Sequence, residues 1–276
     1  MRLTAISAAA ILLAAPALAG VPAMGDIPNE QAKEYADCMT LARRVPAQAL
    51  ESAHAWAGKG GGTPAGHCAA VALIGLGRYQ EAATSMEKLA GSEVNKRKDL
   101  AAGLYGQAAQ AWVLANDSAR AIKDQTAAIE LAPGDPDLLI DRGLALASIA
   151  KYWEAIDDFN QAHDIAGDRA DILVFRAAAY RKLRSLDLAR DDIEQAIKLQ
   201  PRNPDAYLER SIIRQLGNDM AGAKEDWQRT VSFGPGTPAA ETAAANLKQL
   251  EQPAPAAPPA QPIQPNLPLP PAKPQP

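Results

Sequence analysis

The sequence contains few of the residues from which sheets and active sites are commonly built. Aromatic residues make up only 5% of the chain, whereas alanine is very common, and this composition favours closely packed helices over a sheet. There are three histidines, His54, His67 and His163, and none has the spacing of a metal-protease or base–nucleophile motif. We therefore expect an all-α fold without catalytic residues, cofactor or metal ion.

Long runs of basic residues are also missing. The chain has 28 lysines and arginines against 32 acidic residues, and its longest basic run is the triplet 96–98. Proteins that bind nucleic acid usually concentrate positive charge on one face, so this balance excludes a nucleic-acid partner.

The first nineteen residues have the order of a cleavable secretory signal. Arg2 is their only charge, an apolar run extends from Ala5 to Ala15, and small residues precede Gly20. That run is about half of the ~20 residues needed to cross a bilayer, so we expect cleavage and no integral membrane segment in the mature chain. A chain of this kind is typical of a bacterial protein exported to the periplasm.

The other end is rich in proline. The stretch from Pro253 to Pro276 contains eleven prolines and a single charged residue, Lys273. Proline removes backbone donors and fixes φ, so residues 251–276 are predicted to be a disordered, extended tail, either a spacer or a ligand for a proline-reading domain.

Between these ends the sequence repeats itself at a constant period. Four blocks of equal length align, at 102–135, 136–169, 170–203 and 204–237. Small residues recur in columns such as Ala109, Gly143, Ala177 and Ser211, and large ones in columns such as Tyr105, Leu139, Leu173 and Tyr207. Each block ends on a glycine or proline and has a polar turn near its middle, so each is predicted to be a helical hairpin.

Helix starts are marked as well. Asp135 and Asn203 each stand before a proline, which places a capping side chain directly before the first helical position. A single hairpin cannot bury its apolar faces, and we therefore expect the hairpins to stack into a continuous solenoid.

The period, the paired helices and the order of the columns resemble the tetratricopeptide repeat (TPR). The resemblance covers 102–237 and implies a right-handed superhelical solenoid. Residues 76–83 look like part of a looser unit, so 20–101 is predicted to hold one or two divergent hairpins, and 238–250 a capping helix. Three residues depart from the pattern: Arg214 and Gln125 replace large apolar residues, and Gly167 replaces a proline. These departures predict weaker packing of the last hairpin.

Two charged columns follow the same period. Arginine recurs in three blocks and aspartate in all four, at a constant offset from each other, so that antiparallel helices bring the two columns together. We interpret them as structural ion pairs rather than a repeated functional site. The predicted pairs are Arg142 with Asp158, Arg176 with Asp192, and Arg210 with Asp226.

Cys38 and Cys68 are the only cysteines, and in an exported chain they are predicted to form a disulfide bond. The alternative is a zinc site that adds His54 and His67 to the two cysteines. Adjacent His67 and Cys68 diverge by about 100° on a helix, so the disulfide is favoured.

The resemblance to TPR proteins also implies a concave groove formed by the first helices. Carried over by position, the groove residues are Gln110, Val113, Ile140, Leu144, Ala147, Val174, Ala178, Arg181, Lys182, Leu208, Ile212 and Gln215. This set is mostly apolar, with Arg181 and Lys182 offering one contact to an acidic partner. The lysines and asparagines with which some TPR proteins clamp a terminal carboxylate are missing.

The sequence therefore predicts a non-enzymatic protein-interaction adaptor of the cell envelope that binds a protein or peptide segment in the groove. A self-associating structural module, and hence a homo-oligomer, is one alternative. An accessory domain of an exported redox or hydrolytic system is another.

Overall fold

The computed structural model describes residues 29–251, which form thirteen α-helices and no strand. The predicted signal peptide and the proline-rich segment from 252 onward lie outside these residues. The helices are α1 (Asn29–Arg44), α2 (Pro46–Gly58), α3 (Gly62–Gly75), α4 (Tyr79–Glu93), α5 (Lys98–Leu114), α6 (Ser118–Leu131), α7 (Pro136–Ser148), α8 (Tyr152–Ile165), α9 (Ala170–Lys182), α10 (Leu186–Leu199), α11 (Pro204–Leu216), α12 (Met220–Phe233) and α13 (Pro238–Glu251).

Helices α5 to α12 form four antiparallel hairpins, each made of a first and a second helix. The second helices begin at equal intervals along the chain, at Ser118, Tyr152, Leu186 and Met220. The predicted caps are confirmed: the Asp135 carboxylate accepts a hydrogen bond from the backbone N–H of Asp137, and the Asn203 side chain accepts from two backbone N–H groups of α11.

Small residues on the first helices let the second helices approach closely. A Cβ atom added to Gly143 on α7 would lie 2.5 Å from the ring of Phe159 on α8, a distance that real Cβ atoms do not reach. In the next unit Ala177 takes the place of Gly143, and Ile193 takes the place of Phe159; both are buried. The residue on the first helix is therefore larger than in the unit before, and the residue on the second helix is smaller. In these two units the volumes of the facing residues are thus matched in different ways.

The N-terminal helices depart from this regular spacing. A break at Val45–Pro46 separates α1 from α2, as the proline there predicts. Helices α3 and α4 form the looser hairpin expected around residues 76–83, but the interval from the start of α4 to the start of α6 is longer than that between later second helices. The α5 helix is longer than the other first helices and packs extensively on α4, which accounts for the larger spacing.

Helix α13 ends the stack. It follows α11 at the same interval at which α11 follows α9, contacts both α11 and α12, and so occupies the place of a further first helix. The face that would meet a second helix carries exposed Glu241, Ala244, Ala245 and Lys248. The corresponding positions of α11 hold Tyr207, Arg210, Ser211 and Arg214. This face of short or charged side chains suits a cap, which extends to Glu251 and therefore includes the residue at which the tail was predicted to start.

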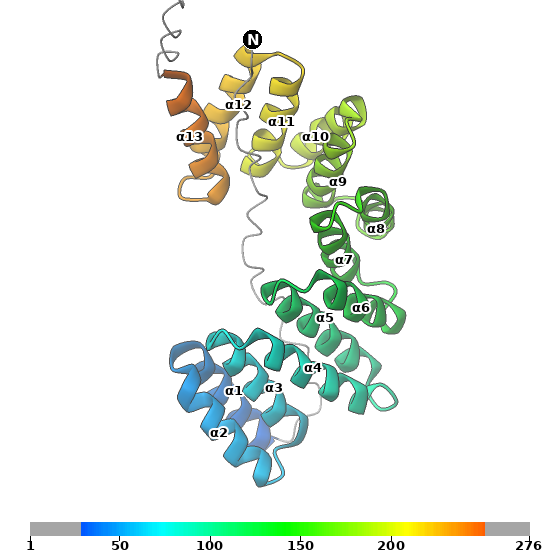
Figure 1. The fold of residues 1–276 in the computed structure, drawn as a ribbon, viewed down its shortest axis with the longest axis vertical. Coiled ribbons are helices and arrows are strands. Elements are labelled where there is room, and N and C mark those ends of the chain that lie inside the picture. Colours follow the sequence, from blue (N-terminus) through cyan, green and yellow to red (C-terminus); the bar gives the residue numbers. More distant parts are fainter. Residues whose placement is uncertain (1–28, 252–276) are drawn as a thin grey trace, which may run out of the picture.

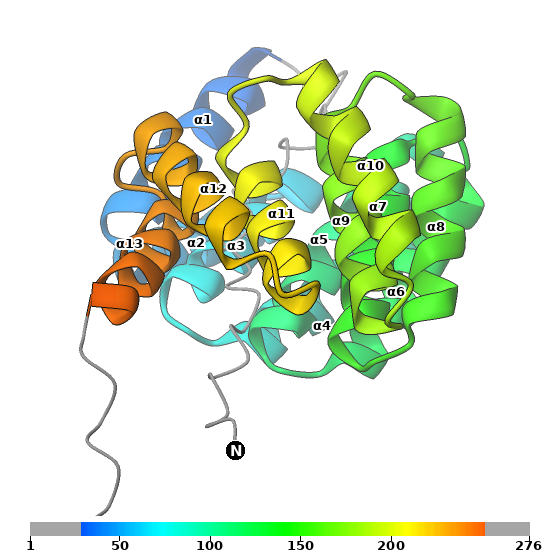
Figure 2. The same cartoon turned by 90° about the horizontal axis from the view of Figure 1, so that it is seen from above.

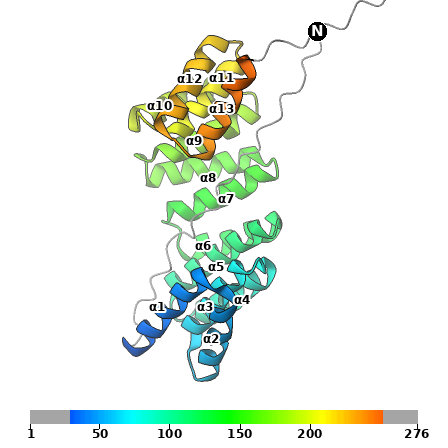
Figure 3. The same cartoon turned by 90° about the vertical axis from the view of Figure 1, so that its left-hand side faces the viewer.

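The helices follow one another along a curved path. Figure 1 shows an arc that runs from α1–α4 at its lower end, past α7 and α8, to α11–α13 at its upper end. The side view shows the same order from end to end (Figure 3). The described residues therefore form a solenoid, as the repeat predicts.

The volume match between Gly143 and Phe159 leads to a test of packing. Because the added methyl group meets a buried ring, we expect Gly143→Ala to lower the free energy of unfolding by about 1–3 kcal/mol, measured by urea denaturation. The double variant Gly143→Ala with Phe159→Ile reproduces the Ala177 and Ile193 pair of the next unit and should regain stability.

The matched control is Gly134→Ala, since no atom lies within 4 Å of a Cβ added there. A loss of stability in this control, or none in Gly143→Ala, would contradict the close approach of α7 and α8.

Candidate protein-binding surface

The contacts between units show which helices line the inner side of the curve. First helix α9 contacts α7 and α11, and α11 contacts α13. Consecutive second helices, within the described range, have no comparable contacts with one another. Stacked units lie closest on the inner side of a bend, so the first helices form the inner surface. Seen from above, α8 lies at the outer edge while α9 and α11 lie nearer the centre (Figure 2).

The predicted groove residues differ in how far they are available on this surface. Gln110, Ile140 and Val174 are buried and Lys182 is exposed. The remaining eight are half-buried: Val113, Leu144, Ala147, Ala178, Arg181, Leu208, Ile212 and Gln215. Several of the apolar ones already pack against a core cluster on one side, as Leu144 and Ala147 do.

Polar groups on the first helices are paired across units. The Arg181 guanidinium forms an ion pair with Glu209 of the next first helix, and both side chains are mostly buried. Arg181 is therefore not available to an acidic partner, and the expectation that it contributes such a contact is wrong. Two units earlier, the Gln110 amide donates to Asp141 of the next first helix at 3.2 Å.

A similar pairing lies at the beginning of the first helices. Arg169 precedes α9 and contacts Asp137 of α7 at 2.5 Å and Asp171 of its own helix at 2.6 Å. The hydrogen bond to Asp171 is the largest cause of the raised pKa of Arg169. The sequence did not predict these pairs, because Arg169, Arg181 and Gln110 do not recur from block to block, although Asp137 and Asp171 share a column.

The three predicted arginine–aspartate pairs all form. In each, the arginine donates Nε and Nη2 to the two oxygens of an aspartate on the second helix, at 2.6–2.9 Å. Arg142 and Arg176 also reach back to the preceding second helix, where they donate to Thr126 and Asn160. These contacts join helices within and between units, which supports a structural role.

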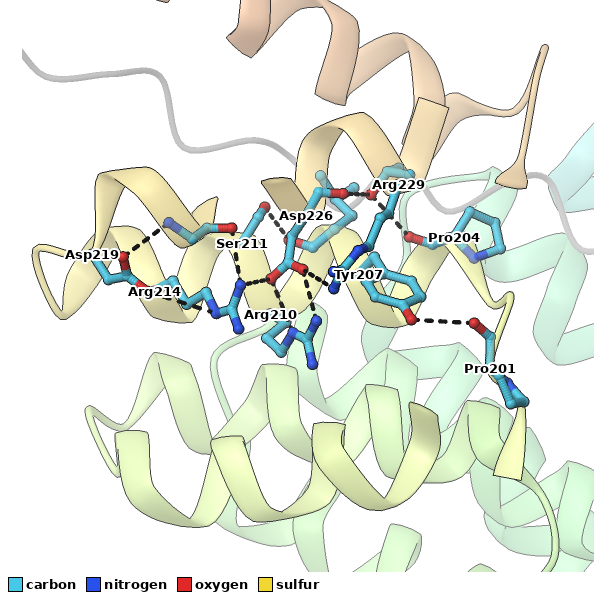
Figure 4. A network of polar contacts seen from close by, with 12 residues as sticks. Pro201, Pro204, Tyr207, Arg210, Ser211, Arg214, Asp219, Asp226 and Arg229 are labelled. Atoms are coloured by element: carbon cyan, nitrogen blue, oxygen red, sulfur yellow. Dashed lines mark hydrogen bonds and ion pairs between the residues drawn. The ribbon is translucent and has the colours of Figure 1, made fainter. Parts of the chain in front are cut away.

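The last pair is part of a larger cluster. Figure 4 shows Arg210, Arg214 and Arg229 converging on Asp226, which is fully buried. Arg214 lies 3.0 Å from the Asp226 carboxylate and donates to the backbone oxygen of Gly222. The prediction that Arg214 weakens the packing of this hairpin is therefore wrong, because its guanidinium is bound by groups of the same hairpin.

The first unit lacks the arginine of this column and has Ala108 in its place. Asp124 is still buried there, and its Oδ2 atom has no hydrogen-bond partner. Glu87, which accepts a hydrogen bond from the Trp112 indole, lies beside it. Burial, together with the interaction with Glu87, raises the pKa of Asp124 to about 7. In mildly acidic solution the unit thus holds a protonated carboxyl group where the others hold an ion pair.

The two cysteines form the predicted disulfide bond, with Cα atoms 6.2 Å apart. It links α1 to α3 and is buried, so a partner's thiol cannot reach it. Neighbouring His67 is bound by the Tyr35 hydroxyl at 2.8 Å and by Gln107 at 2.6 Å. Burial lowers the pKa of His67.

This arrangement decides against the alternative zinc site. Both sulfur atoms are used in the disulfide, His67 is occupied by hydrogen bonds, and His54 is exposed. Nowhere between residues 29 and 251 do three histidine, cysteine or acidic side chains gather as metal ligands would. None of the thirteen described helices is both long and apolar enough to span a membrane.

The contrast between Asp124 and the paired aspartates can be tested by titration. A buried carboxyl whose pKa is raised in the folded state makes the protein less stable as pH rises from about 4 to about 7. We expect Asp124→Asn to remove this loss, so that the variant is more stable than the parent at pH 8. The measurement is thermal unfolding of the parent and the variant from pH 4 to pH 8.

The matched control is Asp192→Asn, which leaves the Arg176 guanidinium without its carboxylate. Breaking such a mostly buried pair costs roughly 3–5 kcal/mol, so this variant should be destabilised at pH 8. Equal destabilisation of both variants would contradict the different states of the two aspartates.

The repeat unit and the fold of this chain are similar to those of known proteins. A family model of the tetratricopeptide repeat matches residues 170–203, which is the third unit. No curated protein matches the chain. Among solved structures, MamA has a TM-score of 0.52 at 15% identity and covers 64% of this chain and 96% of its own. YrrB, a TPR protein with an unusual peptide-binding site, has a TM-score of 0.50 at 15% identity, with 66% and 91% covered.

At these identities the two structures show a common fold and nothing about ligands. The matched unit is one of four that share its length, its hairpin form and its columns of small and large residues. The third unit therefore matches the tetratricopeptide repeat, and the described helices form a solenoid of tetratricopeptide-repeat hairpins.

Proposed function

We propose that this protein is a non-enzymatic adaptor that holds an extended segment of another protein against its inner surface. The observation that carries the proposal is the row of half-buried apolar residues on consecutive first helices, with Leu144 on α7, Ala178 on α9 and Ile212 on α11. Such a row offers contacts to successive side chains of one ligand.

The polar contacts beside this row indicate that the ligand is apolar. The guanidinium of Arg181 and the carboxylate of Asp141 are bound by neighbouring helices, so little charge remains free to recognise a charged partner. YrrB provides an example of a TPR protein with a peptide-binding site. The repeat fold typically serves interaction rather than catalysis, in line with a non-enzymatic role.

We place the adaptor in the cell envelope, most specifically the bacterial periplasm. The signal-like sequence of residues 1–19 is the main support. The buried disulfide bond adds to it, since such bonds form and persist in oxidising compartments.

The experiment places a charge on the inner surface. We expect Leu144→Arg and Ile212→Arg to weaken capture of the partner from envelope extracts by about tenfold or more, since the ligand would have to bury the new charge. The control is Gln195→Arg, which adds the same charge to an exposed position of α10 on the outer side. Far-ultraviolet circular dichroism verifies that all three variants fold.

Equal capture by all variants would contradict the proposal. Light scattering separates it from self-association: a dimer that persists on dilution and dissociates in Leu144→Arg would show that the inner surface binds a second copy instead.

A further inference from the structure

A second apolar surface lies at the edge of the solenoid, where each first helix turns into its second helix. We call it the turn-edge stripe. Its residues, with their exposed fractions, are Leu114 (36%), Ile149 (43%), Trp153 (59%), Leu188 (48%), Leu216 (39%) and Met220 (39%). Trp153 stands out, because the other three tryptophans of the chain are 1–6% exposed.

The stripe runs across consecutive units. Its residues come from the turns between α5 and α6, α7 and α8, α9 and α10, and α11 and α12. The first two of these turns contact each other directly, since the hydroxyl oxygens of Ser118 and Ser148 lie 3.2 Å apart. Repeated apolar exposure along one edge is unusual for scattered surface residues and marks an interaction surface.

Four ion pairs lie beside the stripe, one in each turn, and exposed Lys182 and Arg184 of the turn between α9 and α10 form no ion pair with a described residue. Lys151 lies 3.5 Å from Glu154, next to Trp153, and Arg190 lies 3.2 Å from Asp187, next to Leu188. Asp117 with Arg120 and Asp219 with Arg214 repeat the arrangement at the other two turns. A ligand therefore meets apolar side chains, four ion pairs and two exposed cations, so a segment with almost no charge, and no cluster of positive charge, fits best.

This chain carries a segment of that chemistry. Residues 253–276 lie outside the described structure, contain eleven prolines and include one charged residue, Lys273. They follow α13, which takes the place of a first helix and so ends at the edge where the first helices end. Proline-rich segments bind aromatic side chains in an extended conformation that loses little entropy on binding.

The segment is long enough to reach Trp153. Three steps between contacting helices, from α13 to α11, α9 and α7, amount to roughly 30 Å at 8–10 Å each. About ten extended residues cover that distance at ~3.1 Å per residue. We propose that residues 253–276 dock along the turn-edge stripe of their own chain and cover Trp153.

The test uses the intrinsic fluorescence of Trp153. In the full chain we expect acrylamide to quench tryptophan emission less than in a variant that ends at Gln252. The difference should be about twofold or more, because a tethered segment reaches millimolar effective concentration. The variant Trp153→Phe, made in both chains, identifies the signal and should abolish the difference.

Two further measurements guard against a fold defect in the shortened chain. The full-length variant with Leu267→Ser and Leu269→Ser keeps the length of the segment and should expose Trp153 as the deletion does. A synthetic peptide of residues 253–276, added to the shortened chain, should restore the protection.

Equal quenching of the full and shortened chains would overturn the proposal. Protection that disappears on dilution would also overturn it, since the segment would then bind a second copy. The inner-surface variants Leu144→Arg and Ile212→Arg should leave the fluorescence difference unchanged, which keeps this test separate from that of the adaptor function.

Discussion

The two central hairpins depend on the match between a small side chain on the first helix and a large one on the second helix. Gly143 packs against the large ring of Phe159, whereas the slightly larger Ala177 is paired with the smaller Ile193. Close approach of the two helices brings the arginine of the first helix within reach of the aspartate of the second. Without that approach the guanidinium would be buried far from its carboxylate, which is strongly unfavourable.

The same geometry arranges polar groups for the stack as a whole. Within a unit, arginine and aspartate join the two helices, while Arg142 and Arg176 also reach the preceding unit. On the inner side, Arg181 with Glu209 and Gln110 with Asp141 join consecutive first helices. Most charge between units is thus used to hold the units together. Apolar side chains such as Leu144 and Ile212 on the inner surface, and Trp153 on the turn edge, stay accessible beside these paired charges.

The sequence predicted contacts that repeat from unit to unit, and it missed contacts that occur only once. The hairpins, the caps at Asp135 and Asn203 and the arginine–aspartate pairs all follow from residues that share a column or stand at a helix start. Arg181 and Glu209 are separated by 28 positions and belong to no column, so nothing in the sequence pointed to their contact. Arg214 was misjudged because column identity describes size and not the reach of a long side chain. The sequence does show that Asp124 has no arginine partner in its own unit, since Ala108 stands where the other units have arginine.

Helix α13 has a consequence for the size of the ligand. Because its outer face carries only short or charged side chains, the stack of described helices does not continue past it, and the inner surface has a defined length. The three steps between the four first helices α5, α7, α9 and α11 amount to roughly 24–30 Å at 8–10 Å each. An extended chain covers that distance with about seven to nine residues at ~3.3 Å each. Under the proposed function, the inner surface would therefore contact a segment of about that length, and the rest of a longer partner would lie outside it.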